Sequence, residues 1–237
     1  MRPVNTLHTP IIHLESPELI WEHLDLSSTI QYFWLAKQPY APIWELQKKL
    51  HSKRVERKIS DVILFLEHDH VYTFGKNANT DLLLDSKPND ADVFQIDRGG
   101  QVTYHGPGQL VGYPILDLHN YQKSVSWYMR NLEGVIIYAL KKLGLKASRK
   151  EDLTGVWIGD EKICALGVRL SRWVTMHGFA LNLNPDMKYF DGMIPCGIFN
   201  HGVTSLDELG FDISMKELID NLASSFSILF EEKNDEI

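Results

Sequence analysis

Hydrophobic positions recur along the chain with helical spacing in three stretches. Residues 41–57 place apolar side chains on one helical face, and the same spacing returns over residues 214–230. The clearest helix spans residues 124–143, where Ser124 is suited to cap the start and Gly144 the end. The pattern therefore predicts three amphipathic helices, each with one face toward a core.

Apolar runs between these stretches predict strands. They cover residues 62–66, 110–116, 156–158, 162–170 and 174–183, and residues 71–74 are expected to continue the first run after a break. Because strands and helices are mixed without regular alternation, we expect an α+β fold with a mixed, largely antiparallel sheet flanked by helices. Residues 1–30 are loosely patterned and are predicted to be an N-terminal extension of unknown role, followed by a single domain over residues 31–237.

The composition is that of an ordinary globular protein, because 44% of the 237 residues are hydrophobic and 23% are charged. No apolar run approaches the length of a membrane span, and the N-terminus does not resemble a secretory or transit segment. Two cysteines are too few for a disulfide scaffold, so we expect reduced thiols and a cytoplasmic protein. The net charge of −7 argues against nucleic acid as the main partner.

Two segments are basic despite the acidic total. Residues 48–58 hold six lysines and arginines, and residues 141–150 hold Lys141, Lys142, Lys146, Arg149 and Lys150. Such clusters are either solvated helix faces or a docking surface for an acidic protein partner, and both interpretations stay open.

The two cysteines lie in different surroundings. Cys164 falls inside an apolar, strand-like run, which is typical of an inert core thiol. Cys196 stands between Pro195 and Gly197, two residues that break regular structure and indicate a loop. Free backbone N–H groups in a loop can stabilise an oxyanion when a thiolate attacks a carbonyl, so Cys196 is either a nucleophile or a loop cysteine without a role.

Lys162 begins the strand that contains Cys164. Alternation along a strand would put both side chains on one face. The lysine either reaches water at the strand end or is a partly desolvated amine that exchanges protons. A free thiol with a pKa of about 8.5 is only about 3% thiolate at pH 7, so an adjacent ammonium would activate a cysteine nucleophile. The sequence leaves open whether Lys162 and Cys196 meet.

Residues 98–108 contain four glycines in eleven positions, together with Arg98, Thr103, Tyr104 and His105. This combination predicts a loop that binds a ligand closely, although it matches neither of the common nucleotide-binding glycine motifs. His68 and His70 have a spacing that could chelate a metal, but no further ligands accompany them. A cysteine hydrolase pairing Cys196 with His105 or His177 is a further alternative without a local signature.

Taken together, several segments resemble one known family in order and spacing. They are residues 66–68, 72–75, 98–109 (Arg-Gly-Gly-Gln-Val-Thr-Tyr-His-Gly-Pro-Gly-Gln), 162–167, 174–182, 190–191 and 194–197. The set resembles the octanoyl-acyl-carrier-protein:protein octanoyltransferases, also called lipoyl(octanoyl) transferases, and covers roughly residues 60–205. The spacing from Lys162 to Cys196 agrees as well. Lys76 departs from the family pattern, because arginine is expected there.

The resemblance implies a fold shared with lipoate ligases and the catalytic domain of biotin protein ligases. It also implies that Cys196 is the acyl-thioester nucleophile and that Lys162 lowers the thiol pKa and acts as its acid/base partner. The residues implied to line the acyl and thioester site are Arg98, Gly99, Gly100, Gln101, Val102, Thr103, Tyr104, His105, Ala165, Leu166, Gly167, Gly178, Phe179 and Ala180.

The implied reaction moves octanoyl, or lipoyl, from acyl carrier protein to a lysine of a lipoyl domain. The expected acceptors are 2-oxo acid dehydrogenase acyltransferase subunits and the glycine cleavage H protein. Neither ATP nor a metal is expected, nor is a nucleic-acid or membrane partner, and the default oligomeric state is a monomer. The alternatives are an ATP-dependent lipoate or biotin ligase and a non-catalytic acyl- or carrier-protein-binding module.

Overall fold

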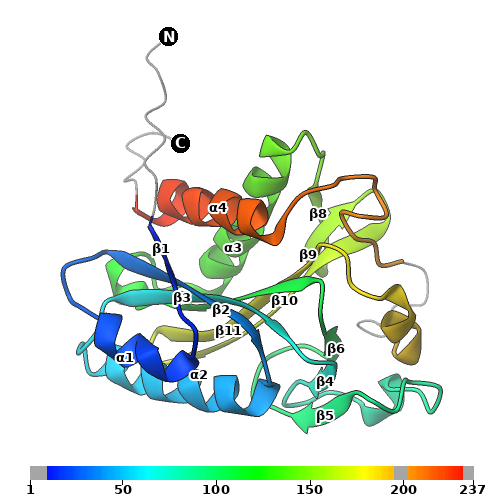
Figure 1. Ribbon diagram of the computed structural model, residues 1–237, viewed down its shortest axis with the longest axis horizontal. Coiled ribbons are helices and arrows are strands. Elements are labelled where there is room, and N and C mark those ends of the chain that lie inside the picture. Colours follow the sequence, from blue (N-terminus) through cyan, green and yellow to red (C-terminus); the bar gives the residue numbers. More distant parts are fainter. Residues whose placement is uncertain (1–9, 195–201, 232–237) are drawn as a thin grey trace.

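The computed structural model of the protein describes residues 10–194 and 202–231, with an eight-stranded sheet at its centre (Figure 1). In spatial order the strands are β1 (Ile11–His13), β2 (Ile30–Gln38), β3 (Asp61–His68), β7 (Gln109–Ile115), β11 (Val174–Asn182), β10 (Glu161–Ser171), β9 (Leu153–Ile158) and β8 (Ser148–Lys150). The first three strands run parallel, and the remaining neighbours pair antiparallel. The predicted mixed, largely antiparallel sheet is confirmed.

Helices cover both faces of this sheet (Figure 1). One face packs against α1 (Ile20–His23) and α2 (Tyr40–Val55). The other packs against α3 (Val125–Lys142) and α4 (Met215–Phe226), which η6 (Ser227–Glu231) continues. The three predicted helices are confirmed, including the cap, because Ser124 Oγ accepts a hydrogen bond from Trp127 N at 3.2 Å. Of the helices in the described ranges, none has both the length and the apolarity to cross a membrane.

A second, three-stranded sheet corrects one prediction. Residues 71–74 do not continue β3 but form β4 (Val71–Phe74), which lies between β5 (Asp92–Gln95) and β6 (Val102–His105). Val71 packs with Ile96 against Tyr40 at the start of α2, so the small sheet is anchored beside that helix end. The chain therefore leaves the large sheet after His68, because the core beside α2 takes up the second apolar run.

The N-terminal segment contributes to the large sheet. β1 pairs with β2 at the sheet edge, with Ile11 opposite Tyr32. Leu14 and Ile20 are buried in the core between the sheet and α2. The described part of residues 1–30 is thus packed onto the domain that follows it.

Candidate active site

Three hollows meet around β10. The inner cavity lies between β6, β10 and β11. The outer cleft lies between residues 98–103, the start of α3, the β8–β9 turn and β10. The side cavity is smaller and lies beside residues 190–193 and 203. Thr103 and Ala165 line all three hollows, so the hollows join at these two residues.

Lys162 lines the outer cleft and the side cavity, and only 7% of it is exposed. Its backbone holds the segment that follows the predicted cysteine loop. Lys162 N donates to Gly202 O at 2.9 Å, and Thr204 N donates to Lys162 O at 3.1 Å. Met193 and Val203, on either side of that loop, line the side cavity with Lys162.

Cys196 itself lies outside the described residues. Ile194, the last described residue before it, is held by a hydrogen bond from its N–H to Leu82 O at 2.8 Å. Both ends of the segment that contains Cys196 are therefore anchored, one of them directly on Lys162.

The predicted inert position of Cys164 is confirmed, since it is fully buried in the core beside α3. Burial raises the pKa of the Cys164 thiol. The prediction that Lys162 shares its face is wrong, because the pairing of β10 with β9 shifts register between the two residues. Lys162 lines cavities that Cys164 does not reach.

The loop of residues 98–101, here called the glycine loop, is clamped between two strands. Gly99 N donates to Val168 O at 3.0 Å on β10, and Gly75 N donates to Gln101 O at 3.2 Å after β4. A Cβ on Gly75 would lie 2.0 Å from Gly100 O, so the two backbones touch only because a side chain is missing. The loop forms one wall of the outer cleft.

Arg98 is buried at the start of this loop. Its Nη2 donates to Thr73 O at 2.6 Å and to Thr73 Oγ1 at 3.0 Å, and its Nη1 donates to Gly99 O at 2.9 Å. The guanidinium is thus fixed where the inner cavity meets the outer cleft, and it brings a positive charge to that junction.

A relay of buried polar groups runs from the inner cavity to the segment beside Lys162. His105 Nδ1 lies 2.9 Å from Gln109 Oε1, Gln109 Nε2 donates to Asn182 Oδ1 at 2.9 Å, and Asn182 Nδ2 donates to Thr204 O at 2.9 Å. Burial lowers the pKa of His105 to about 3, so the ring is neutral. With Nδ1 as the donor to Gln109, His105 Nε2 is left as an acceptor.

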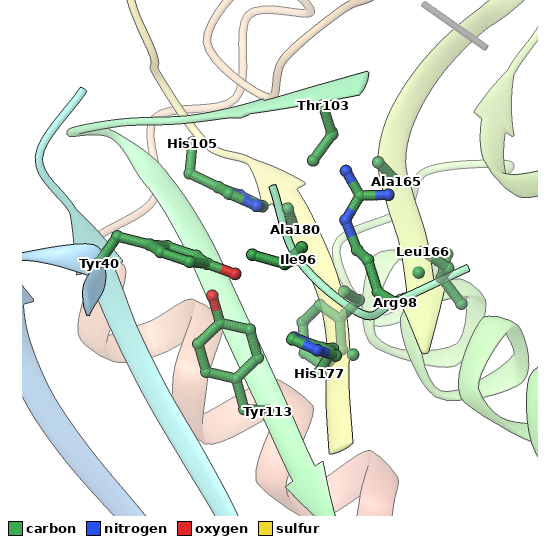
Figure 2. A pocket seen from close by; sticks show the side chains of 13 residues that line it. Tyr40, Ile96, Arg98, Thr103, His105, Tyr113, Ala165, Leu166, His177 and Ala180 are labelled. Atoms are coloured by element: carbon green, nitrogen blue, oxygen red, sulfur yellow. The ribbon is translucent and has the colours of Figure 1, made fainter. Parts of the chain in front are cut away.

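Several residues that line the inner cavity were missed by the sequence prediction. Figure 2 shows the hydroxyls of Tyr40 and Tyr113 converging at the end away from Arg98. Tyr113 Oη donates to His68 Nε2 at 2.8 Å, because His68 Nδ1 donates to Gln38 O. Aromatic residues in core-like runs carry no local signal that they border a cavity.

His177 lines the same cavity and contacts Asp97, which forms an ion pair with Arg169. Its Nε2 lies 2.9 Å from Asp97 Oδ1, and Arg169 Nη1 lies 2.7 Å from Asp97 Oδ2. The hydrogen bond from His177, helped by the charges of His177 and Arg169, lowers the pKa of Asp97 to about 2. His177 belongs to residues 174–182, which were among the segments resembling the family, but the predicted site began one residue later, at Gly178.

The structure brings most of the predicted substrate-binding residues together. The inner cavity is lined by Arg98, Thr103, His105, Ala165, Leu166, Gly167, Gly178, Phe179 and Ala180. The outer cleft adds Gly99, Gly100, Gln101 and Val102. Tyr104 lies apart, because it is fully buried, stacks on Tyr189 with ring centroids 5.0 Å apart, and bonds His70 Nδ1 at 2.8 Å.

The two histidines considered as metal ligands serve separate contacts. Both ring nitrogens of His68 have protein partners, while His70 stacks on Tyr189 with ring centroids 4.0 Å apart. Within residues 10–194 and 202–231, no group of three or more histidine, cysteine or acidic side chains is placed to hold a metal ion.

Comparison with solved structures confirms the predicted fold. Lipoate-protein ligase A bound with ATP superposes with a TM-score of 0.66 at 17% identity, covering 82% of this chain and 83% of that one. The biotin protein ligase of Aquifex aeolicus, solved with biotin and ATP, gives a TM-score of 0.53 at 17% identity over 84% of this chain and 69% of that one.

Closer relatives are found by sequence. An octanoyltransferase of Flavobacterium johnsoniae is 45% identical over 228 residues, which cover 87% of this chain and 98% of that protein. One of Caldanaerobacter subterraneus subsp. tengcongensis is 41% identical over 203 residues, covering 84% and 89%. The model of the lipoyl protein ligase A/B catalytic domain matches residues 39–227. With this match and these identities, the chain belongs to the lipoyl protein ligase A/B catalytic domain family and, within it, to the octanoyltransferases.

Proposed function

We propose that this acyltransferase takes octanoyl from acyl carrier protein, holds it as a thioester on Cys196 and passes it to a lysine of a lipoyl domain. The observation that carries the proposal is the pair of backbone hydrogen bonds between Lys162 and residues 202 and 204. Residues 202 and 204, which follow Cys196, are bonded to the strand that carries Lys162, and Lys162 lines the outer cleft and the side cavity. The proposal requires the Cys196 thiol to reach this amine.

The inner cavity is the proposed acyl site. It meets the hollows around Lys162 at Thr103 and Ala165, so a chain bound within it would present its carbonyl carbon at that junction. Its walls combine Leu166, Phe179 and Ala180 with the neutral ring of His105. Such a mainly apolar lining with a few fixed polar groups suits an eight-carbon chain.

The chemistry balances with the two residues alone. The Cys196 thiolate attacks the carbonyl of the incoming thioester, and the carrier thiol leaves with a proton from the Lys162 ammonium. The lipoyl-domain amine then attacks the Cys196 thioester and gives its proton to Lys162 as the amide forms. The cysteine leaves as a thiolate, which restores the starting state. The ammonium favours the thiolate in both steps.

No nucleotide or metal enters these steps, because the incoming acyl group is already activated as a thioester. The proposed acceptors are the lipoyl domains of 2-oxo acid dehydrogenase acyltransferase subunits and the glycine cleavage H protein. The enzyme is proposed to act as a monomer in the cytoplasm. The second candidate, ATP-dependent ligation, has the support that lipoate-protein ligase A, a structural neighbour, binds ATP.

Intact mass spectrometry after mixing with octanoyl-acyl-carrier protein tests the proposal. Wild type should gain a hydroxylamine-labile octanoyl group and lose it when a lipoyl domain is added. Cys196→Ser should gain no thioester, and Lys162→Ala should acylate at least tenfold more slowly. Cys164→Ala is the matched control, because that buried thiol lines none of the three hollows, and it should behave as wild type.

Wild type that stays unmodified, while the lipoyl domain is modified only with ATP and free octanoate, would replace this proposal by the ligase. If the octanoyl group on the enzyme is hydrolysed to free octanoate and is never transferred to the lipoyl domain, the protein is a hydrolase.

A further inference from the structure

A tryptophan ring lies between two lysines across three neighbouring strands. On β9, Trp157 pairs with Ser148 of β8 on one side and with Lys162 of β10 on the other. Lys162 Nζ lies 4.8 Å from the centre of the ring, and Lys150 Nζ lies 5.0 Å from it. Only 1% of Trp157 is exposed, so these contacts are largely shielded from water.

The two lysines have different surroundings. Lys150 Nζ is 2.5 Å from Asp160 Oδ1, in the turn between β9 and β10, and that aspartate is well exposed. Lys150 is therefore matched by a carboxylate at the surface. Lys162 instead lies deeper and borders the outer cleft and the side cavity.

Gly155 forms a second wall along the Lys162 side chain. It shares a strand face with Trp157, and a Cβ there would lie 3.1 Å from Lys162 Cε and 2.9 Å from Cys164 O. Gly155 has a positive φ of 134° and donates its N–H to Glu133 Oε1 at 3.2 Å. The alkyl part of Lys162 thus runs through a slot that a side chain at position 155 would narrow.

We infer that Trp157 is a positioning residue for the transfer reaction: its ring, with Gly155, forms the seat that holds the Lys162 ammonium in place. This rests on the proposed role of Lys162. An aromatic face attracts an ammonium but cannot accept its proton. The ring therefore stabilises the charged amine without taking its proton.

Other charged groups also lie around Lys162. Arg98 and Asp152 line the outer cleft with it, Glu133 lies behind Gly155, and Lys150 and Asp160 lie at the ring. A test must change the ring without changing these groups or admitting water.

Site-specific replacement of Trp157 by tryptophans with one to four fluorine atoms meets that need. Fluorine weakens the negative face of the ring while nearly preserving its shape. Competitive acetylation, read by mass spectrometry at the Lys162 peptide, measures the pH at which this amine becomes reactive. We expect that midpoint to fall stepwise, by about one pH unit across the series, because each fluorine destabilises the ammonium. The rate of Cys196 acylation should lose its alkaline limb at correspondingly lower pH.

Trp44 provides the matched control, because Lys48 Nζ lies 3.7 Å from its ring centre on α2. Fluorination of Trp44 should leave the Lys162 midpoint unchanged. If the pH midpoint of Lys162 acetylation is the same in all the fluorinated Trp157 proteins, the inference is wrong, whether or not the thioester forms. Failure of wild type to form a thioester would instead refute the proposed function, while the labelling series would still decide whether the ring is the seat.

Discussion

Asn182 holds the carbonyl oxygen of Thr204 with a hydrogen bond of 2.9 Å, and its own Oδ1 accepts from Gln109 Nε2. All three side chains are buried. Thr204 is therefore tied through Gln109 to His105 in the wall of the inner cavity, as well as directly to Lys162.

We predict that Asn182→Leu slows Cys196 acylation and lowers the free energy of unfolding by about 1–3 kcal/mol, since it leaves the Thr204 carbonyl and the Gln109 amide buried without partners. Urea denaturation and a single-turnover octanoyl thioester assay measure the two effects. Asn131→Ala is the control, because Asn131 Nδ2 makes a similar bond of 2.8 Å to Trp127 O on α3. It should cost stability without slowing acylation, and an equal slowing in both variants would contradict the prediction.

The local hydrophobic pattern predicted the helices and strands better than it predicted how the strands pair. Ser124 marked the start of α3, and the apolar run of β3 was buried as expected. The separate pairing of residues 71–74 could not be seen, because a short apolar strand does not reveal which edge it joins. The register shift after Lys162 was also hidden, since strict alternation is the only rule that a sequence supplies for a strand.

The candidate site divides in the same way. Glycine-rich and strand motifs located Arg98, Thr103 and Ala165, all of which line the inner cavity. Tyr40 comes from a helix start far away in the sequence, so only the folded chain brings it to the cavity. Tyr104 belonged to the right motif but faces the opposite side of its strand.

Buried neutral histidines predict a loss of stability in mild acid. Burial lowers the pKa of His68 to about 4 and that of His105 to about 3, against an ordinary value of 6.5. Below about pH 6.5 these histidines become protonated in the unfolded chain but stay neutral in the folded protein. The free energy of unfolding should therefore be fully retained above pH 6.5 and fall toward pH 4, by up to about 1.4 kcal/mol per pH unit for each histidine.

Urea denaturation between pH 8 and 5 checks this slope. His68→Gln should reduce the slope of the free energy of unfolding against pH by the contribution of one histidine. The fold should be kept, because glutamine can still donate to Gln38 O and accept from Tyr113. Asp97 acts in a different window, since its pKa is lowered to about 2 and its contribution is lost only below pH 3.8. An unchanged slope in His68→Gln would show that this histidine is not the source.

The basic segment at the end of α3 is predicted to dock the acidic carrier protein. The structure reduces the number of candidate docking residues. Arg149 donates to Glu133 and Lys142 donates to Ser224, so Lys141 and Lys146, which are exposed, are the better candidates. The double variant Lys141→Glu with Lys146→Glu should raise KM for octanoyl-acyl-carrier protein severalfold, more strongly at low salt. Turnover of a small octanoyl thioester should not change.

Lys49→Glu with Lys53→Glu, on exposed positions of α2, is the matched charge reversal. It should leave KM for the carrier protein close to that of wild type. Equal effects from both double variants, or equal loss on the small thioester, would refute a specific docking surface on α3.

The acyl cavity should accept octanoyl poorly once a larger side chain narrows it. Ala180 is 2% exposed, lines only the inner cavity and pairs with Ala165, which lies at the junction of the three hollows. Ala180→Leu should therefore lower kcat/KM for octanoyl thioester at least about tenfold, because added methylenes in a closed apolar pocket exclude substrate methylenes of similar volume.

Butanoyl thioester is the internal control, because its shorter chain needs less of the cavity volume. Ala139→Leu overpacks a fully buried position on α3 that borders none of the three hollows. It should lower stability without changing the octanoyl-to-butanoyl ratio. If Ala180→Leu lowers both substrates equally, the chain does not extend into the inner cavity, and the outer cleft becomes the better candidate for the acyl site.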